Sequence, residues 1–155
     1  MPNILYRSRF FIALLVSMLL LVSGCKKNTA TNPVTENVLE QYFEVNILNR
    51  DFKVVLATDN GADLTSNYDG YLFRLLKNTY YDGPMTGTKN GVVFTGTWST
   101  NDDFSKLNIT IDHPTPPASF SFLNRAWRFT RKAVPVMELA PWGTTDAKVL
   151  HMERL

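Results

Sequence analysis

Apolar and polar residues alternate along most of the chain after residue 50, and this period of two restricts the folds that are open to it. The clearest run places Leu107, Ile109 and Ile111 between polar neighbours, the pattern of a half-buried β-strand. Similar runs occupy residues 52–57, 71–75, 92–98, 127–130, 134–139 and 149–152. Residues 79–86 form a further candidate, although Gly83-Pro84 would bend that strand or place it at an edge of the sheet.

Turn-forming pairs separate these runs. Asn-Gly or Asp-Gly occurs at 60–61, 69–70, 82–83 and 90–91, Asn101-Asp102 is another turn signal, and the prolines within 114–117 cannot join a ladder. No long helical period follows residue 50. About eight short strands with tight connections predict an all-β fold, a small antiparallel up-and-down β-barrel, because closure removes exposed sheet edges.

A short helix is expected just before the barrel. Asn37 and Glu40 have the spacing of a capping box, and one helical face would carry an apolar set comprising Val38, Leu39, Tyr42, Phe43 and Ile47. The alternation of Phe43, Val45 and Ile47 also suits a strand, so that alternative stays open for residues 38–48.

The N-terminus has the form of an export signal. Arg7 and Arg9 precede an apolar run over residues 10–22, which is short for a membrane span. Leu21-Val22-Ser23-Gly24-Cys25 resembles the bacterial lipobox, which implies cleavage before Cys25 and lipidation of that residue. The alternative is an ordinary cysteine after a secretory signal. Cys25 is the sole cysteine, so no intramolecular disulfide can form.

These features divide the chain into a signal peptide (1–24), a lipidated N-terminus with a flexible tether (25–36) and a barrel domain with its N-terminal helix (37–155). We expect a cell-envelope protein held to a bilayer by acylated Cys25. Lys26, and the lack of acidic residues in 26–30, favour the periplasmic face of the outer membrane. Arg7 and Arg9 account for the net charge of +2, so the mature part is neutral and no nucleic-acid partner is expected.

Five short motifs resemble the lipocalin-like domain of small Bacteroidetes-type lipoproteins. They are an acidic-glycine turn at 59–65, Gly-Tyr-Leu-Phe at 70–73, Gly-Thr-Trp-Ser at 96–99, Leu-Asn-Arg-Ala-Trp at 123–127 and the final strand at 149–152. The resemblance covers residue 50 to the end and implies a small antiparallel barrel. It supplies no ligand, because Trp98 lies mid-domain rather than in the first strand, where true lipocalins carry their Gly-x-Trp.

The sequence offers no strong catalytic or metal motif. His113 and His151 are the only histidines, and neither has cysteine or clustered acidic neighbours with metal-ligand spacing. Nucleophile elbows, zinc-protease helices and phosphate loops are missing, and Asp102-Asp103 suits a hairpin end. The loop 59–63 suits turn chemistry better than calcium. We therefore expect no cofactor, no metal and no enzymatic activity.

Candidate contact residues are aromatic or basic. Trp98 and Trp127 are expected in the core, whereas Trp142, Tyr80 and Tyr81 are candidates for ligand or partner contact. Arg128 is a fourth candidate and belongs to a basic cluster of Arg125, Arg128, Arg131 and Lys132. Strand alternation would place Arg128 and Lys132 on one face and Arg131 on the other. A solvated basic face is the alternative.

Two functions fit these features best. The first is binding of a small apolar ligand at the open end of the barrel; the second is an interaction module with a filled barrel, serving an outer-membrane complex. An unrecognised enzyme is the third. An aromatic-lined cavity would favour the first function, and a filled interior the second.

Overall fold

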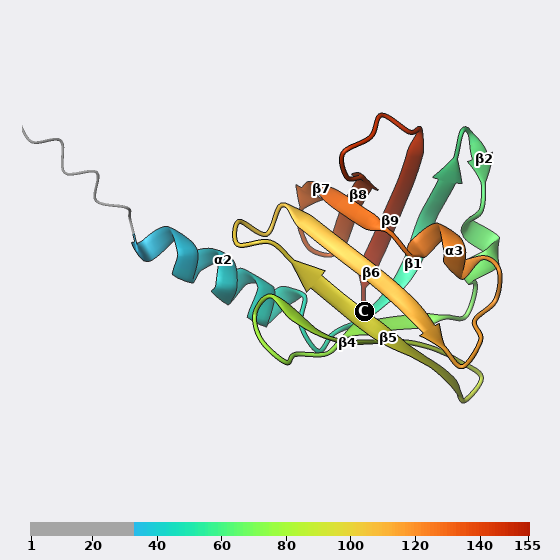
Figure 1. Ribbon diagram of the computed structural model, residues 1–155, viewed down its shortest axis with the longest axis horizontal. Helices are drawn as coiled ribbons and strands as arrows, with labels where there is room; N and C mark the ends of the chain where they lie inside the picture. The colour runs from blue at the N-terminus through green and yellow to red at the C-terminus, as the bar shows by residue number, and fades with distance from the viewer. Residues whose placement is uncertain (1–32) are drawn as a thin grey trace, which may run out of the picture. The chain divides into compact units, whose positions relative to one another are not determined.

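The computed structural model describes residues 33–155, and eight of its strands close into an antiparallel barrel (Figure 1). The barrel order is β1, β3, β4, β5, β6, β7, β8 and β9, and β9 pairs back onto β1. A ninth strand, β2, forms a hairpin with the far end of β1. The predicted all-β barrel of about eight strands is confirmed. The strands are β1 (Asp51–Asp59), β2 (Ala62–Asp63), β3 (Leu72–Leu75), β4 (Asp82–Lys89), β5 (Val92–Thr100), β6 (Lys106–His113), β7 (Ala126–Lys132), β8 (Val136–Pro141) and β9 (Lys148–Arg154).

Two Asn-Gly pairs form tight hairpin turns. Asn60 and Gly61 have φ of 50° and 83° between β1 and β2, and Asn90 and Gly91 have 52° and 78° between β4 and β5. Turns with positive φ at both central residues match the twist of antiparallel strands, and asparagine and glycine tolerate that conformation best. The turn chemistry of the sequence therefore sets these two strand connections.

Apolar side chains from around the barrel meet in one contiguous core. Leu107, Ile109 and Ile111 of β6 are all buried, as their alternation predicts. Trp98 and Trp127 are 1 % and 0 % exposed, which confirms their expected place in the core. Their indole N–H groups donate to the carbonyls of Leu76 (2.7 Å) and Leu123 (2.9 Å), so neither polar atom is left unpaired.

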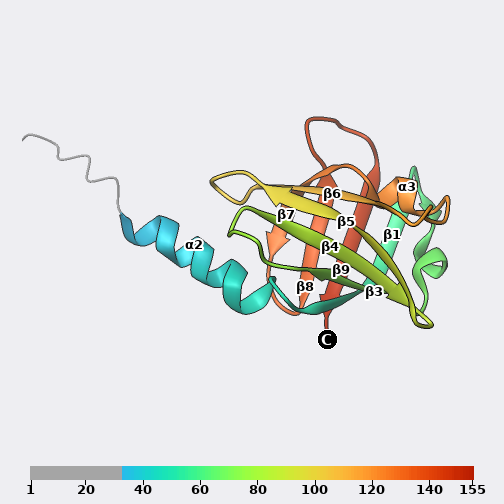
Figure 2. The same cartoon turned by 60° about the horizontal axis from the view of Figure 1, so that its bottom comes forward.

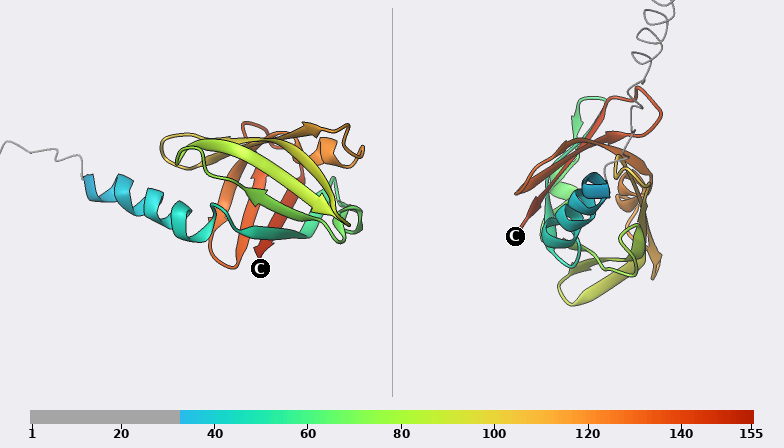
Figure 3. Two further views of the ribbon diagram at one scale, coloured as in Figure 1. Left: turned by 90° about the horizontal axis from the view of Figure 1, so that it is seen from below. Right: turned by 90° about the vertical axis from the view of Figure 1, so that its left-hand side faces the viewer.

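Two helices lie at opposite ends of the barrel (Figures 2 and 3). Helix α2 (Pro33–Asn46) buries Phe43, whose ring lies 4.4 Å from Phe104 and 5.8 Å from Phe129 between centroids. Helix α3 (Phe120–Leu123) buries Phe120 against Tyr71 and Phe94, at 5.1 and 5.4 Å. A 3₁₀ turn, η2 (Thr65–Tyr68), follows β2. The sequence pattern did not reveal α3, because one helical turn is too short to show a period.

The helical alternative for residues 38–48 is confirmed, but its predicted start is wrong. Helix α2 begins at Pro33, so Asn37 lies inside it rather than capping it, and residues 33–36 are helical rather than part of a tether. Proline suits the first helical position because its missing N–H would have no helical partner there. Within residues 33–155, no helix is both long and apolar enough to cross a bilayer. Cys25 and the rest of the export signal lie outside the described residues.

Gly83-Pro84 does not end the sheet, contrary to the edge position that its proline suggested. Pro84 pairs with Thr97 inside the closed barrel, and its carbonyl accepts from Leu76 N at 2.8 Å. An antiparallel partner would normally return a hydrogen bond to Leu76 O, which proline cannot donate. The Trp98 indole supplies that bond instead, and Gly83 leaves room for it, since a Cβ there would lie 2.0 Å from Leu76 O.

Candidate functional site

The four candidate contact residues fall into two separate groups. Tyr80 and Tyr81 lie beside α2, where the Tyr81 hydroxyl donates to Glu40 Oε1 at 2.8 Å and its ring stacks on Phe104 at 5.3 Å. Lys77 Nζ lies 4.0 Å from the centroid of Tyr80 and forms an ion pair with Glu44 of α2. These contacts fasten α2 to the barrel, which gives both tyrosines a structural role.

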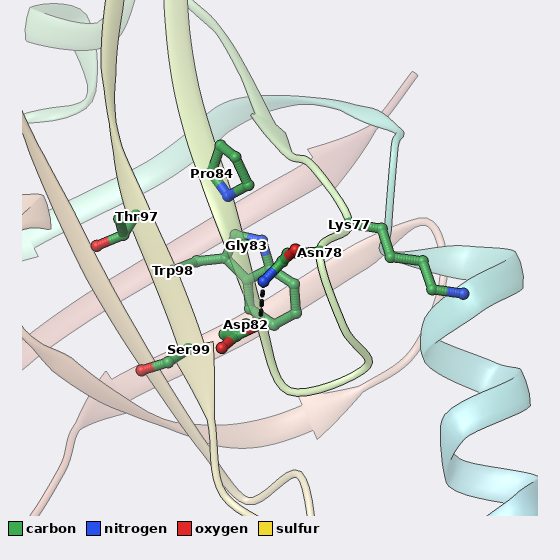
Figure 4. A pocket seen from close by; sticks show the side chains of 8 residues that line it. All are labelled: Lys77, Asn78, Asp82, Gly83, Pro84, Thr97, Trp98 and Ser99. Atoms are coloured by element: carbon green, nitrogen blue, oxygen red, sulfur yellow. Dashed lines mark hydrogen bonds between the residues drawn. The ribbon is translucent and has the colours of Figure 1, made fainter.

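A shallow pocket of about 500 Å³ adjoins the same loop (Figure 4). Its lining residues are Lys77, Asn78, Asp82, Gly83, Pro84, Thr97, Trp98 and Ser99. Several of its polar groups already have partners: Asn78 Nδ2 donates to Asp82 Oδ1 (3.3 Å, dashed in Figure 4), and Ser99 Oγ accepts from Asn108 Nδ2 (2.9 Å). Bonds within the protein account for this polar lining, so the pocket does not by itself indicate a ligand.

Trp142 and Arg128 belong to the part of the barrel wall in which β6, β7 and β8 are neighbours. Figure 1 shows these three strands. Trp142 follows β8, its backbone N–H donates to Ala126 O at 3.0 Å, and its side chain is 38 % exposed. Arg128 is also exposed, two residues along β7 from Ala126. Alternation in a strand places Ala126 and Arg128 on the same face, so this face brings the two candidates close together.

Lys106 completes this group, and sequence analysis missed it. It stands directly opposite Arg128 in the β6–β7 register, and its Nζ lies 5.6 Å from the centroid of Trp142. We call Lys106, Arg128 and Trp142 the outer-wall patch. No local pattern marks Lys106, because its neighbours come from two other strands.

The charges of the outer-wall patch differ from those elsewhere on the barrel. Four register pairs join opposite charges: Asp51 with Arg74, Lys53 with Glu153, Asp59 with Lys148, and Arg131 with Glu138. All four also form ion pairs. Lys106 and Arg128 form a register pair of like charges, and no carboxylate among residues 38–155 forms an ion pair with either. Like charges directly opposite in a sheet are destabilising.

A β-bulge overturns the predicted faces of the basic cluster. The register of β7 against β8 shifts between Phe129 and Arg131, so Arg131 pairs with Glu138 at 3.2 Å and Lys132 lies opposite the buried Met137. Arg131 therefore shares the outer face with Arg128, and Lys132 does not. Burial lowers the pKa of Lys132, and the charge of Asp103 partly offsets that shift.

Arg125, the remaining member of the cluster, has a structural use. Its Nε donates to Phe122 O at 2.8 Å, and its guanidinium lies 5.5 Å from the ring centroids of both Phe122 and Trp127. These contacts hold α3 against the start of β7. Of the four clustered basic residues, Arg128 is thus the one that the described fold does not use.

The other polar candidates occupy turns or exposed positions. His113 is 83 % exposed at its side chain, and no three His, Cys, Asp or Glu residues gather as a metal site among the described residues. Hydrogen bonds from Ser105 hold the pKa of Asp103 below its usual range, and hydrogen bonds from Thr65 do the same for Asp63. Both carboxylates therefore stabilise turns, as the sequence suggested.

The barrel has a counterpart among solved structures. A crystal structure of a DUF4847 family protein from Bacteroides vulgatus ATCC 8482 superposes with a TM-score of 0.50 over 72 % of this chain and 95 % of that one. The two sequences are 16 % identical, so the likeness is one of fold. No family model and no curated protein matches the chain. The match agrees with the resemblance to uncharacterised Bacteroidetes-type domains; lipidation and lipocalin likeness stay predictions.

Proposed function

We propose that this chain is a lipid-anchored envelope protein whose barrel is a filled scaffold that binds a partner or ligand on its outer wall. The anchoring half rests on the sequence, namely the apolar run that ends in the lipobox-like segment before Cys25. Acyl chains on Cys25 would hold the protein to the outer membrane, facing the periplasm, since stable attachment takes two lipid signals. The protein would bind a partner or ligand and would have no enzymatic activity.

The burial of large aromatic side chains in the core is the observation that carries the binding half. Trp98 and Trp127 occupy the core, while Phe43 and Phe120 are fully buried at the two ends. A small apolar ligand inside the barrel would have to displace these rings, at a cost of several kcal/mol for each large side chain removed from the core. This favours the interaction module over the carrier of an apolar ligand.

Fractionation of cells tests the anchor. Cys25→Ser should leave unprocessed precursor or release the protein from the membrane, and mass spectrometry of the wild-type N-terminus should show acyl chains on the cysteine. Normal processing and unchanged membrane partition of the variant would contradict the proposal.

Native mass spectrometry tests the filled barrel. Mature protein purified from its own host should carry no apolar small molecule, and a panel of fatty acids should give no thermal shift. A stoichiometric apolar molecule that co-purifies with the protein would instead restore the carrier function.

A further inference from the structure

We infer that the outer-wall patch binds an acidic saccharide, a sugar ring that itself carries a carboxylate or a phosphate. This ligand class makes the proposed function more specific, because it names what the outer wall binds. It rests on the outer-wall binding in the proposed function, not on the lipid anchor or the filled interior.

The need for an anion follows from the two cations. Lys106 and Arg128 face each other in register, whereas the barrel supplies a carboxylate to the cation in every other charged register pair within β1 to β9. Glu138, on the same face of β8, is already paired with Arg131. An anion placed between the two cations would turn repulsion into two attractions. The arginine fork binds carboxylate or phosphate with two parallel hydrogen bonds, and lysine adds a point charge.

The need for a ring follows from Trp142. Trp142 is 38 % exposed, and the outward positions between it and the cations are alanines, Ala126 on β7 and Ala140 opposite Arg128 on β8. An exposed aromatic ring beside small side chains offers an apolar surface with a polar border. Lys106 Nζ lies over the indole ring, 5.6 Å from its centroid, so an anion bound to this ammonium group lies above the ring. The ligand must therefore carry its charge on or beside the ring that stacks.

The number and placement of the cations argue against a membrane surface as the occupant. Clusters that bind anionic bilayers contain about four to eight lysines or arginines. Here only two cations stand opposite each other in register, and the neighbouring Arg131 is paired with Glu138. A bilayer is therefore a competing outcome of the test.

Titration calorimetry of the full mature protein in detergent tests the inference. The probes are trigalacturonate with its methyl ester, and glucose 6-phosphate with glucose, so that the carboxylate and phosphate sources are compared with neutral partners. We expect an acidic probe to bind at least tenfold more tightly than its neutral partner. Arg128→Gln and Trp142→Ala should each weaken that binding at least tenfold.

Lys53→Gln is the matched control, because it removes one outer-wall cation from an opposite-charge register pair. Its affinity for the acidic probe should equal that of the wild type. Circular dichroism and melting temperature establish that each variant is folded. Lys106→Glu adds an independent readout: it should abolish binding while raising the melting temperature, which a simple loss of fold cannot do.

Three results would overturn the inference: no binding of either acidic probe, equal binding of acidic and neutral probes, or full binding by Trp142→Ala. Vesicles of phosphatidylglycerol that bind through the patch, with the sugars inactive, would also refute it in favour of a bilayer. If the wild-type protein bound the acidic sugar but carried no acyl chain, the proposed lipid anchor would be refuted and this inference would still hold. An apolar molecule inside the barrel would defeat the filled scaffold instead.

Discussion

Lys106 on β6 and Arg128 on β7 form a like-charged cross-strand pair on a barrel that otherwise matches its charged register partners by sign. The like-charged pair lowers stability. Neither cation has a carboxylate partner among residues 38–155, and Lys106 Nζ instead lies over the ring of the exposed Trp142. Sites that sacrifice stability for binding are a recurrent feature of functional surfaces.

Reversing one charge of this pair should stabilise the protein. We expect Lys106→Glu to raise the free energy of unfolding by roughly 0.5–1 kcal/mol, because a repulsive cross-strand pair becomes attractive. Urea denaturation measures the change, and the gain should shrink at 1 M salt, where the Debye length falls to about 3 Å. Lys53→Glu is the mirror control and should destabilise, since it places two glutamates opposite each other. Equal effects of the two variants would refute the electrostatic account.

Removing the ring that anchors α2 should destabilise the whole domain. Phe43 is 0 % exposed and packs on Phe104 and Phe129. Phe43→Ala should cost about 3–5 kcal/mol through lost burial and a residual cavity. The neighbouring exposed Gln41→Ala should change stability by less than about 0.5 kcal/mol. An unfolding curve of Phe43→Ala that overlays the wild type would mean that α2 does not stabilise the barrel.

Substituting alanine for Gly83 or for Gly91 should destabilise the protein, for a different reason at each position. A Cβ at Gly83 would lie 2.0 Å from Leu76 O and 3.0 Å from Trp98 Nε1, so Gly83→Ala should cost about 3 kcal/mol or more and disturb the Trp98 fluorescence. Gly91 has φ of 78° with open space around it, so Gly91→Ala should cost only about 1–2 kcal/mol and leave the spectrum unchanged. If Gly83→Ala left the free energy of unfolding unchanged, the close approach of Leu76 O and Trp98 Nε1 to Gly83 would be refuted.

Stability should fall at alkaline pH because of Tyr68. Its hydroxyl donates to Ser119 O at 2.8 Å, and burial raises its pKa from 10.0 to about 12. Between these values the unfolded tyrosine loses its proton while the folded one keeps it, so unfolding becomes easier as pH rises. The loss is on the order of 2 kcal/mol and is complete above the folded pKa.

Denaturation at a series of pH values measures this loss, and Tyr68→Phe provides the control. The variant should be less stable near neutral pH, where it lacks the hydrogen bond to Ser119, and should show a flatter alkaline decline. An alkaline decline that is the same in wild type and variant would assign the effect to other groups, such as Tyr42, whose pKa burial also raises.

Local sequence determined the strands, the turns and the core. The alternation of Leu107, Ile109 and Ile111 and the Asn-Gly pairs are short-range signals, because side-chain direction and turn conformation depend on adjacent residues. The exposed position of Trp142 was also predictable, since Pro141 and Gly143 flank it in a loop. The helix before the barrel could be predicted, but not its start at Pro33.

Tertiary structure alone decided the register of β6, β7 and β8, and with it the candidate site. The β7 bulge moved Arg131 to the outer face and turned Lys132 away, and strand pairing set Lys106 opposite Arg128. Trp98 donates the hydrogen bond to Leu76 O that Pro84 cannot donate. This substitution brings together residues from three separate segments of the chain. The physical reason is that a one-residue shift in pairing reverses every later side chain, and that shift depends on long-range packing which no local pattern encodes.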